Sequence, residues 1–168
     1  MRKILTDRRP ISGHLHPTPH TAIEQLQLPN EVSFEHLLEA VEDAHGKPIK
    51  LRLVPSSTIP GLSGLWLETE AKSHILVPES HPRLLRMHVI CHEFGHILLG
   101  HQGCEGLAVP IPSIFNHIGR QKGIRRMLAR SPQWNDMEKA AEEVAYMLSP
   151  LVLEGPTAPV SRFEEVFG

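Results

Sequence analysis

The 168-residue chain contains only two cysteines, Cys91 and Cys104, and a single tyrosine. Two cysteines are too few for a disulfide framework or for a zinc site made of four cysteines. No apolar run approaches the roughly 18 residues that are needed to span a bilayer. The N-terminus has a basic start without an apolar segment after it, which argues against a secretory signal. We therefore expect a soluble, cytoplasmic protein with no membrane partner.

A strong excess of one charge is also absent. The 17 lysines and arginines nearly balance the 19 acidic residues, for a formal net charge of −2, and aromatic residues make up only 5% of the chain. Domains that bind nucleic acid are usually strongly basic, and single-strand binders present aromatic rings for stacking. The composition therefore disfavours direct nucleic-acid binding, and it is otherwise that of an ordinary globular protein with one domain.

The first 30 residues contain four prolines and no sustained periodicity. They predict a mobile or loosely packed leader. His14, His16 and His20 lie within it. A metal-binding arm is the alternative interpretation, but nothing in this segment fixes a ligand geometry, so we favour the leader.

We predict that residues 31–150 form the folded domain, with an insert at about 103–134 and a C-terminal tail at 151–168. Hydrophobic periodicity and glycine, proline and serine positions predict its elements. In chain order, these are a helix from Phe34 to Gly46, a strand over 49–54, a hairpin with strands 64–69 and 73–78, a long helix from Pro82 to Leu99, short helical pieces up to Arg130, and a last helix over about 135–148. The expected fold class is α+β, with a small antiparallel sheet of about three strands packed with helices.

The long predicted helix contains the pattern His-Glu-x-x-His at positions 92–96. Residues four apart lie on one face of a helix, so His92 and His96 can reach one zinc ion at about 2.0–2.1 Å. Glu93 would then point at the metal-bound water and serve as general base. Gly95 costs roughly 1 kcal/mol in a helix relative to alanine, which predicts a close backbone neighbour at that position.

Two histidines leave a catalytic zinc ion one protein ligand short. The last predicted helix offers Glu138 and Glu142 on one face, with Ala141 and Ala145 beside them. These small residues would let the two helices approach closely. One carboxylate could bind the metal while the other orients a ligand histidine. The pattern leaves open which does which, and whether Glu138 only caps its own helix.

Four more residues near the motif have candidate roles. His88 lies one turn before the motif and is expected to line the cleft or contact a ligand. His101 follows a glycine, and we expect it to point away and act as a cation or cap at the helix C-terminus. We interpret Cys91 as a small buried hydrophobe and not as a redox sensor. Tyr146 and His88 are both candidates for the donor that stabilises an oxyanion.

About two thirds of the chain, from Phe34 to Leu148, resembles the ImmA/IrrE family of small zinc metallo-endopeptidases, in particular short actinobacterial members that are often labelled toxin components. The matching stretches are Gly64-Leu65-Trp66-Leu67, the run from His92 to His101, the basic stretch from Ile124 to Arg130, and Glu138-x-x-Ala141-Glu142-x-x-Ala145. Glu142 stands where many members have asparagine. The family fold has a small antiparallel sheet beside the zinc helix.

The resemblance implies that His92, His96 and Glu138 bind one Zn²⁺ per chain and that Glu93 is the catalytic base. Better-known members cleave helix-turn-helix repressors encoded beside them, so the implied partner is a protein substrate of that kind. The expected function is therefore a zinc endopeptidase that cleaves a regulatory protein.

Two further expectations concern partners. A substrate segment could add to an exposed edge of the strand over 73–78. The alternative to an enzyme is a non-catalytic, metal-stabilised module that binds a transcriptional regulator, with the basic stretch over 120–130 as a docking surface. Nothing in the pattern indicates an oligomeric state.

Overall fold

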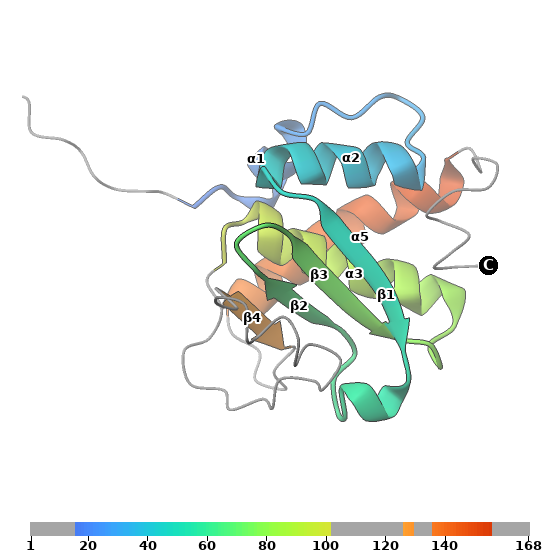
Figure 1. The fold of residues 1–168 in the computed structure, drawn as a ribbon. Coiled ribbons are helices and arrows are strands. Elements are labelled where there is room, and N and C mark those ends of the chain that lie inside the picture. Colours follow the sequence, from blue (N-terminus) through green and yellow to red (C-terminus); the bar gives the residue numbers. More distant parts are fainter. Residues whose placement is uncertain (1–15, 102–125, 130–135, 156–168) are drawn as a thin grey trace, which may run out of the picture.

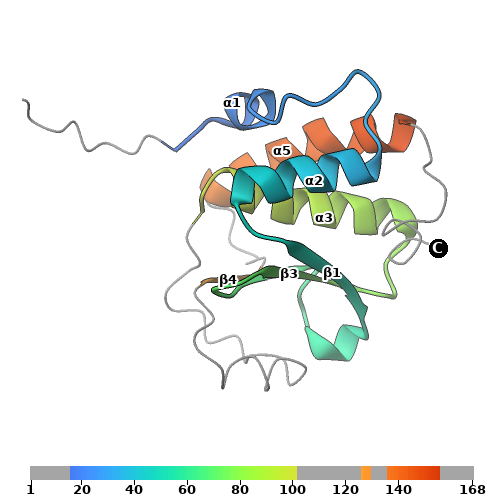
Figure 2. The same ribbon diagram turned by 45° about the horizontal axis from the view of Figure 1, so that its top comes forward.

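The computed structural model describes residues 16–101, 126–129 and 136–155 (Figure 1). Within these ranges a small sheet forms one layer, and Figure 2 shows the α-helices gathered on one side of it. The α-helices are α1 (Pro19–Glu24), α2 (Phe34–His45), α3 (Arg83–Leu98) and α5 (Asp136–Glu154), and a short 3-10 helix, η1 (Ser56–Thr58), follows the first strand. The strands are β1 (Ile49–Val54), β2 (Leu65–Glu68), β3 (Ser73–Pro78) and β4 (Arg126–Ala129). The predicted α+β class with a small sheet is confirmed.

The sheet has the strand order β1-β3-β2-β4. Strand β2 is antiparallel to β3 and to β4, whereas β1 and β3 run parallel. The sheet is mixed because the chain runs back along β2 before it forms β3, so β3 has the same direction as β1. The expectation of an antiparallel sheet is therefore wrong for the β1–β3 pair. Strand β3 lies in the interior, paired on both sides. The expectation that strand 73–78 offers a free edge to a substrate is therefore wrong.

The segment over 126–129 forms a strand and not a helical piece, so that prediction is also wrong. Its four residues pair with β2, from Leu65 opposite Ala129 to Glu68 opposite Arg126. Pairing between segments about 60 residues apart here overrides the local spacing of apolar residues, as tertiary context often does. The remainder of the predicted insert lies outside the described residues.

The ends of α2 agree with the prediction. The Ser33 side chain accepts a hydrogen bond from the backbone N–H of His36, and Gly46 follows the helix with a left-handed φ of +72°. The end predicted for the last helix is wrong, because α5 continues through Pro150 to Glu154. Proline removes one backbone donor, but the buried Val152 beyond it keeps the last turn on the core.

The packed domain begins before residue 31. Of the predicted leader, the structure describes residues 16–30, and these include α1, which packs against α3 and α5. Ala22 and Leu26 from this segment belong to the main hydrophobic core. Pro19 occupies the first turn of α1, where its missing N–H costs nothing.

The sheet has buried residues on both faces. Trp66, Ile75 and Phe94 belong to the core between the sheet and the helices, while Leu65 and Leu76 belong to a second, smaller cluster. No helix among the described residues is both long enough and apolar enough to cross a membrane.

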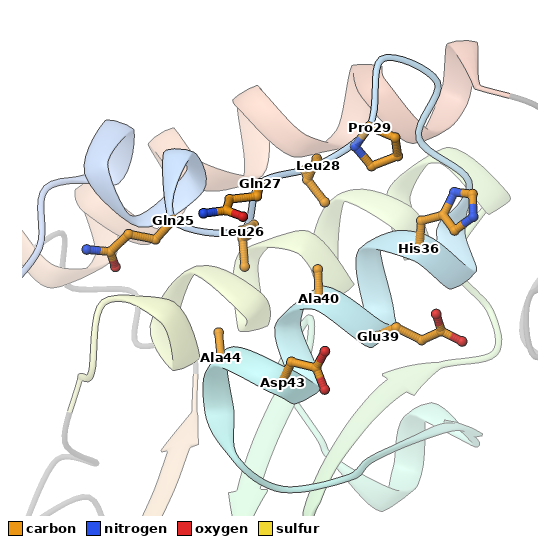
Figure 3. Close-up of a pocket in the computed structure, with 10 residues that line it drawn as sticks. All are labelled: Gln25, Leu26, Gln27, Leu28, Pro29, His36, Glu39, Ala40, Asp43 and Ala44. Carbon is orange, nitrogen blue, oxygen red and sulfur yellow. The ribbon is translucent and has the colours of Figure 1, made fainter.

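A groove of about 320 Å³ lies between residues 25–29 and the outer face of α2. Figure 3 shows the residues that line it. Glu39 and Asp43 line it from the helix, and Gln25 and Gln27 line it from the segment after α1. None of its lining residues belongs to the His-Glu-x-x-His motif. The groove is therefore separate from the site described below.

His74 on β3 is expected to make stability depend on pH. Burial, followed by the positive charges of Arg52, Lys72 and Lys50, lowers the pKa of His74 from 6.5 to about 4. Between these two pH values His74 is protonated in the unfolded chain but stays neutral in the folded chain. The free energy of unfolding therefore falls as the pH drops from about 6.5 towards 4. His74 alone should change the free energy of unfolding by up to about 1.4 kcal/mol per pH unit.

Urea unfolding at pH 7 and pH 5 measures this effect. The His74→Leu variant lacks the titrating group, so its unfolding free energy should fall by less between the two pH values than that of the unaltered chain. An equal fall in both proteins would contradict the assignment.

Candidate metal centre

Helices α3 and α5 pack directly against each other (Figure 1). His92 and His96 lie on α3, and Glu138 and Glu142 lie on α5. Gly95 makes the close packing possible. A Cβ atom at this position would lie 2.8 Å from the backbone oxygen and 2.9 Å from the Cα of Ala141. The close backbone neighbour predicted from this helical glycine is therefore present, and it belongs to the helix that carries the two candidate carboxylates.

The structure brings His92, His96 and Glu138 together. The Nε2 atoms of the two histidines lie 3.1 Å apart, Glu138 Oε2 lies 3.3 Å from His92 Nε2, and Glu138 Oε1 lies 3.4 Å from His96 Nε2. Ligand atoms about 2.0–2.1 Å from a tetrahedral zinc ion are about 3.3–3.4 Å from one another. All three residues are buried, and one ligand atom from each lies within 4.8 Å of the other two. The three residues thus have the chemistry and the spacing of a small metal site.

The carboxyl group of Glu138 is held in its ionised form. Burial raises its pKa, but hydrogen bonds and charge interactions with His92 and His96 outweigh this effect and lower the pKa to about 2. An ionised carboxylate thus faces two imidazole nitrogens in a site shielded from water. This arrangement provides the electron pairs and the negative charge that a divalent cation requires.

Glu142 faces the opposite edge of the first histidine. Its Oε2 atom lies 2.9 Å from His92 Nδ1, and its Oε1 atom lies 2.9 Å from His88 Nε2. A carboxylate accepts hydrogen bonds, so His92 donates to Glu142 through Nδ1. In a neutral His92 with its proton on Nδ1, the lone pair of Nε2 would be available to a metal. The sequence left the two carboxylates interchangeable, and the structure places them at different edges of the same imidazole.

His88 reaches the site through Glu142 and not through one of the three possible ligands. Its ring centroid is also 5.1 Å from that of Tyr146, whose exposed fraction is 67%. Both candidates for an oxyanion donor therefore lie on the Glu142 side of His92, since His88 contacts Glu142 and Tyr146 lies beside His88.

Glu93 is buried, with an exposed fraction of 1%, and its side chain extends towards the residue that precedes β2. A Cβ atom at Gly64 would lie 2.9 Å from Glu93 Oε1 and 2.5 Å from a methyl carbon of Val89. The absence of a side chain at Gly64 therefore leaves the space that Glu93 occupies. This glycine belongs to one of the stretches on which the family resemblance depends.

Sequence reasoning missed the role of His101, and the expectation that it points away from the motif is wrong. Its Nδ1 atom lies 2.9 Å from Nδ1 of His96, and its exposed fraction is 8%. Burial, followed by the nearby His96, lowers the pKa of His101 to about 4. It is therefore neutral near pH 7 and does not act as a cation at the helix end. Gly100, which turns the chain back after α3, was the available signal for this contact.

Cys91 is fully buried, and burial raises the pKa of its thiol to about 12 even though Ser149 hydrogen-bonds to it. A thiol in this state is a poor nucleophile and is shielded from oxidants. The interpretation as a small buried hydrophobe is confirmed. Cys104 lies outside the described residues, as does the basic stretch 120–130 apart from residues 126–129.

Comparisons with protein-family models, with curated proteins and with solved structures find no match to this chain.

Proposed function

We propose that this protein is a zinc-dependent endopeptidase of the ImmA/IrrE type that cleaves a regulatory protein such as a helix-turn-helix repressor. The convergence of His92 Nε2, His96 Nε2 and the Glu138 carboxylate is the observation that carries the proposal. Two imidazoles and one carboxylate are a common ligand set of catalytic zinc, because three protein ligands leave a fourth position open. The family and the class of substrate are what the sequence resemblance described above implies.

In this proposal His92, His96 and Glu138 hold the metal, and Glu142 fixes the orientation of His92 from its other edge. When bound, zinc supplies Lewis-acid chemistry, which polarises a peptide carbonyl and makes water more acidic. Glu93, one residue from the first ligand, accepts a proton from the attacking water and passes it to the leaving amine nitrogen. Burial of these groups keeps bulk water away from the proton transfer.

Metal content per chain is the direct test, measured by elemental mass spectrometry on protein purified without a polyhistidine tag. We expect about one zinc ion per chain in the unaltered protein. Glu138→Ala should abolish zinc retention. Glu142→Ala should weaken binding on the order of 10- to 100-fold and still load at high zinc concentration, because Glu142 acts through His92.

A chain that takes up no zinc when the metal is supplied would overturn the proposal, and so would equal losses in the two glutamate variants. The reaction itself is tested by incubating the zinc-loaded protein with a helix-turn-helix regulator encoded beside it. Fragments support an endopeptidase. A regulator that is bound but stays intact would contradict it and favour the non-catalytic binding module.

A further inference from the structure

The turn after α3 brings the chain back onto the second histidine of the motif. Gly100 follows the helix with a left-handed φ of +64°. Its N–H donates to the carbonyl of Ile97 at 3.1 Å, and the N–H of the next residue, His101, donates to the carbonyl of His96 at 3.0 Å. These two bonds define a Schellman motif, in which the second residue after the C-cap lies over the last turn of the helix. The backbone therefore places the ring of His101 beside that of His96.

The contact between the two rings has one arrangement that is compatible with metal binding. Their Nδ1 atoms are 2.9 Å apart, so one nitrogen donates a proton and the other accepts it. If His96 uses the lone pair of Nε2 for a metal, its proton is on Nδ1. His101 must then accept through an unprotonated Nδ1 and carry its own proton on Nε2.

We propose that His101 is a positioning residue of the metal centre: it accepts the hydrogen bond that fixes the tautomer and ring orientation of His96. Its role matches that of Glu142 at His92, with a neutral imidazole in place of a carboxylate. Partners of this kind hold ligand histidines in the orientation that metal binding needs. The inference rests on the proposed zinc site and adds a second supporting residue to it.

A further contact holds the turn itself. The Nδ1 atom of His16, from the segment before α1, lies 3.2 Å from the backbone oxygen of Leu99 and donates to it. The last carbonyl groups of a helix lack partners within the helix, so an external donor stabilises this end. His16 thereby connects the segment before α1 to the turn that carries His101.

Zinc affinity of the full chain, measured by competition with a chromophoric chelator, tests the inference. His101→Leu removes the acceptor and should weaken zinc binding on the order of 10- to 100-fold. His101→Asn provides an amide oxygen near the lost nitrogen and should recover most of the affinity. His74→Leu is the matched control, because it removes an equally buried imidazole from the sheet and should leave zinc affinity unchanged.

Two readouts separate positioning from a merely structural role. In the cobalt-substituted protein, the visible absorption bands should shift in His101→Leu and stay unchanged in His74→Leu. Nitrogen NMR of the zinc-loaded chain should find the proton of His101 on Nε2, with its Nδ1 unprotonated. A proton on Nδ1 of His101 would overturn the inference.

A second variant keeps the inference testable if His101→Leu fails to fold. His16→Ala removes a contact that holds the turn and should weaken zinc binding relative to the unaltered chain. His81→Ala removes a 3.2 Å contact to the carbonyl of Ser63 and should not weaken it. Unchanged affinity in His101→Leu, or in His16→Ala where His101→Leu does not fold, would overturn the inference and leave the proposed function standing. Absence of zinc binding by the unaltered chain would instead overturn both.

Discussion

Replacing Glu93 with glutamine is expected to abolish cleavage of the regulator while zinc stays bound. Glutamine keeps the size of the side chain and fits the space beside Gly64, but its amide does not accept a proton at neutral pH. Loss of a general base costs on the order of 10²- to 10⁴-fold in rate. The measurement is the rate at which fragments appear, with metal content determined on the same sample.

Glu143→Gln is the matched control for this substitution. Glu143 is exposed on α5, so its variant should cleave at the rate of the unaltered chain if Glu93 is the base. Full activity in Glu93→Gln would show that Glu93 is not the base. Loss of zinc in Glu93→Gln would show instead that the residue supports the ligands.

The central part of the candidate site was predictable because it depends on local geometry. The i,i+4 spacing of His92 and His96 fixes their common face whatever surrounds the helix. Gly95, costly within a helix, and the small residues of the last helix pointed to the close packing that brings Glu138 to them. Each of these inferences requires only helix geometry and a comparison of side-chain sizes.

The distinction between Glu138 and Glu142 required tertiary structure. The two residues share a helix face, so periodicity treats them alike. Only the axial offset between α3 and α5 decides which carboxylate meets the Nε2 edges and which meets the Nδ1 edge of His92.

His101 shows a different limit of the periodicity argument. Five residues after His96, it falls on another face of an ideal helix, so extrapolating the helix sends it away from the site. The helix ends before it, and Gly100 reverses the chain direction through its positive φ. A glycine just after the end of a helix indicates a Schellman turn, because glycine adopts a positive φ without strain. The position of Gly100 therefore predicts the path of the chain here better than side-chain spacing does.

Long-range pairing explains the errors in the sheet. The alternation in 49–54 and 73–78 identified two strands but not their relative direction, which follows from the path of the chain between them. Strand β4 is only four residues long, and its local pattern favours a helix as readily as a strand. The spacing of apolar residues therefore could not predict its pairing with β2.

Adding a single methyl group at Gly95 is expected to weaken both the fold and the metal site. In Gly95→Ala the new Cβ meets the backbone of Ala141 at under 3 Å, and a backbone cannot rotate away as a side chain can. Such overpacking typically costs about 1–3 kcal/mol, which offsets or exceeds the roughly 1 kcal/mol that alanine gains in a helix. Gly95→Val should be worse. Urea unfolding measures the change in stability, and chelator competition measures zinc affinity.

The two effects are linked because α5, which must move away from α3, is the helix that carries Glu138. A shift of this helix lengthens the separations of 3.3 and 3.4 Å between the carboxylate and the two histidines.

Gly46→Ala is the matched control. The φ of +72° at Gly46 is strained for alanine and costs on the order of 1–2 kcal/mol. The new Cβ would meet nothing within 4 Å, and it lies at the end of α2. Zinc affinity should therefore fall in Gly95→Ala and stay unchanged in Gly46→Ala at similar stability. Equal zinc affinity in the two variants would mean that the spacing of α3 and α5 does not control the site.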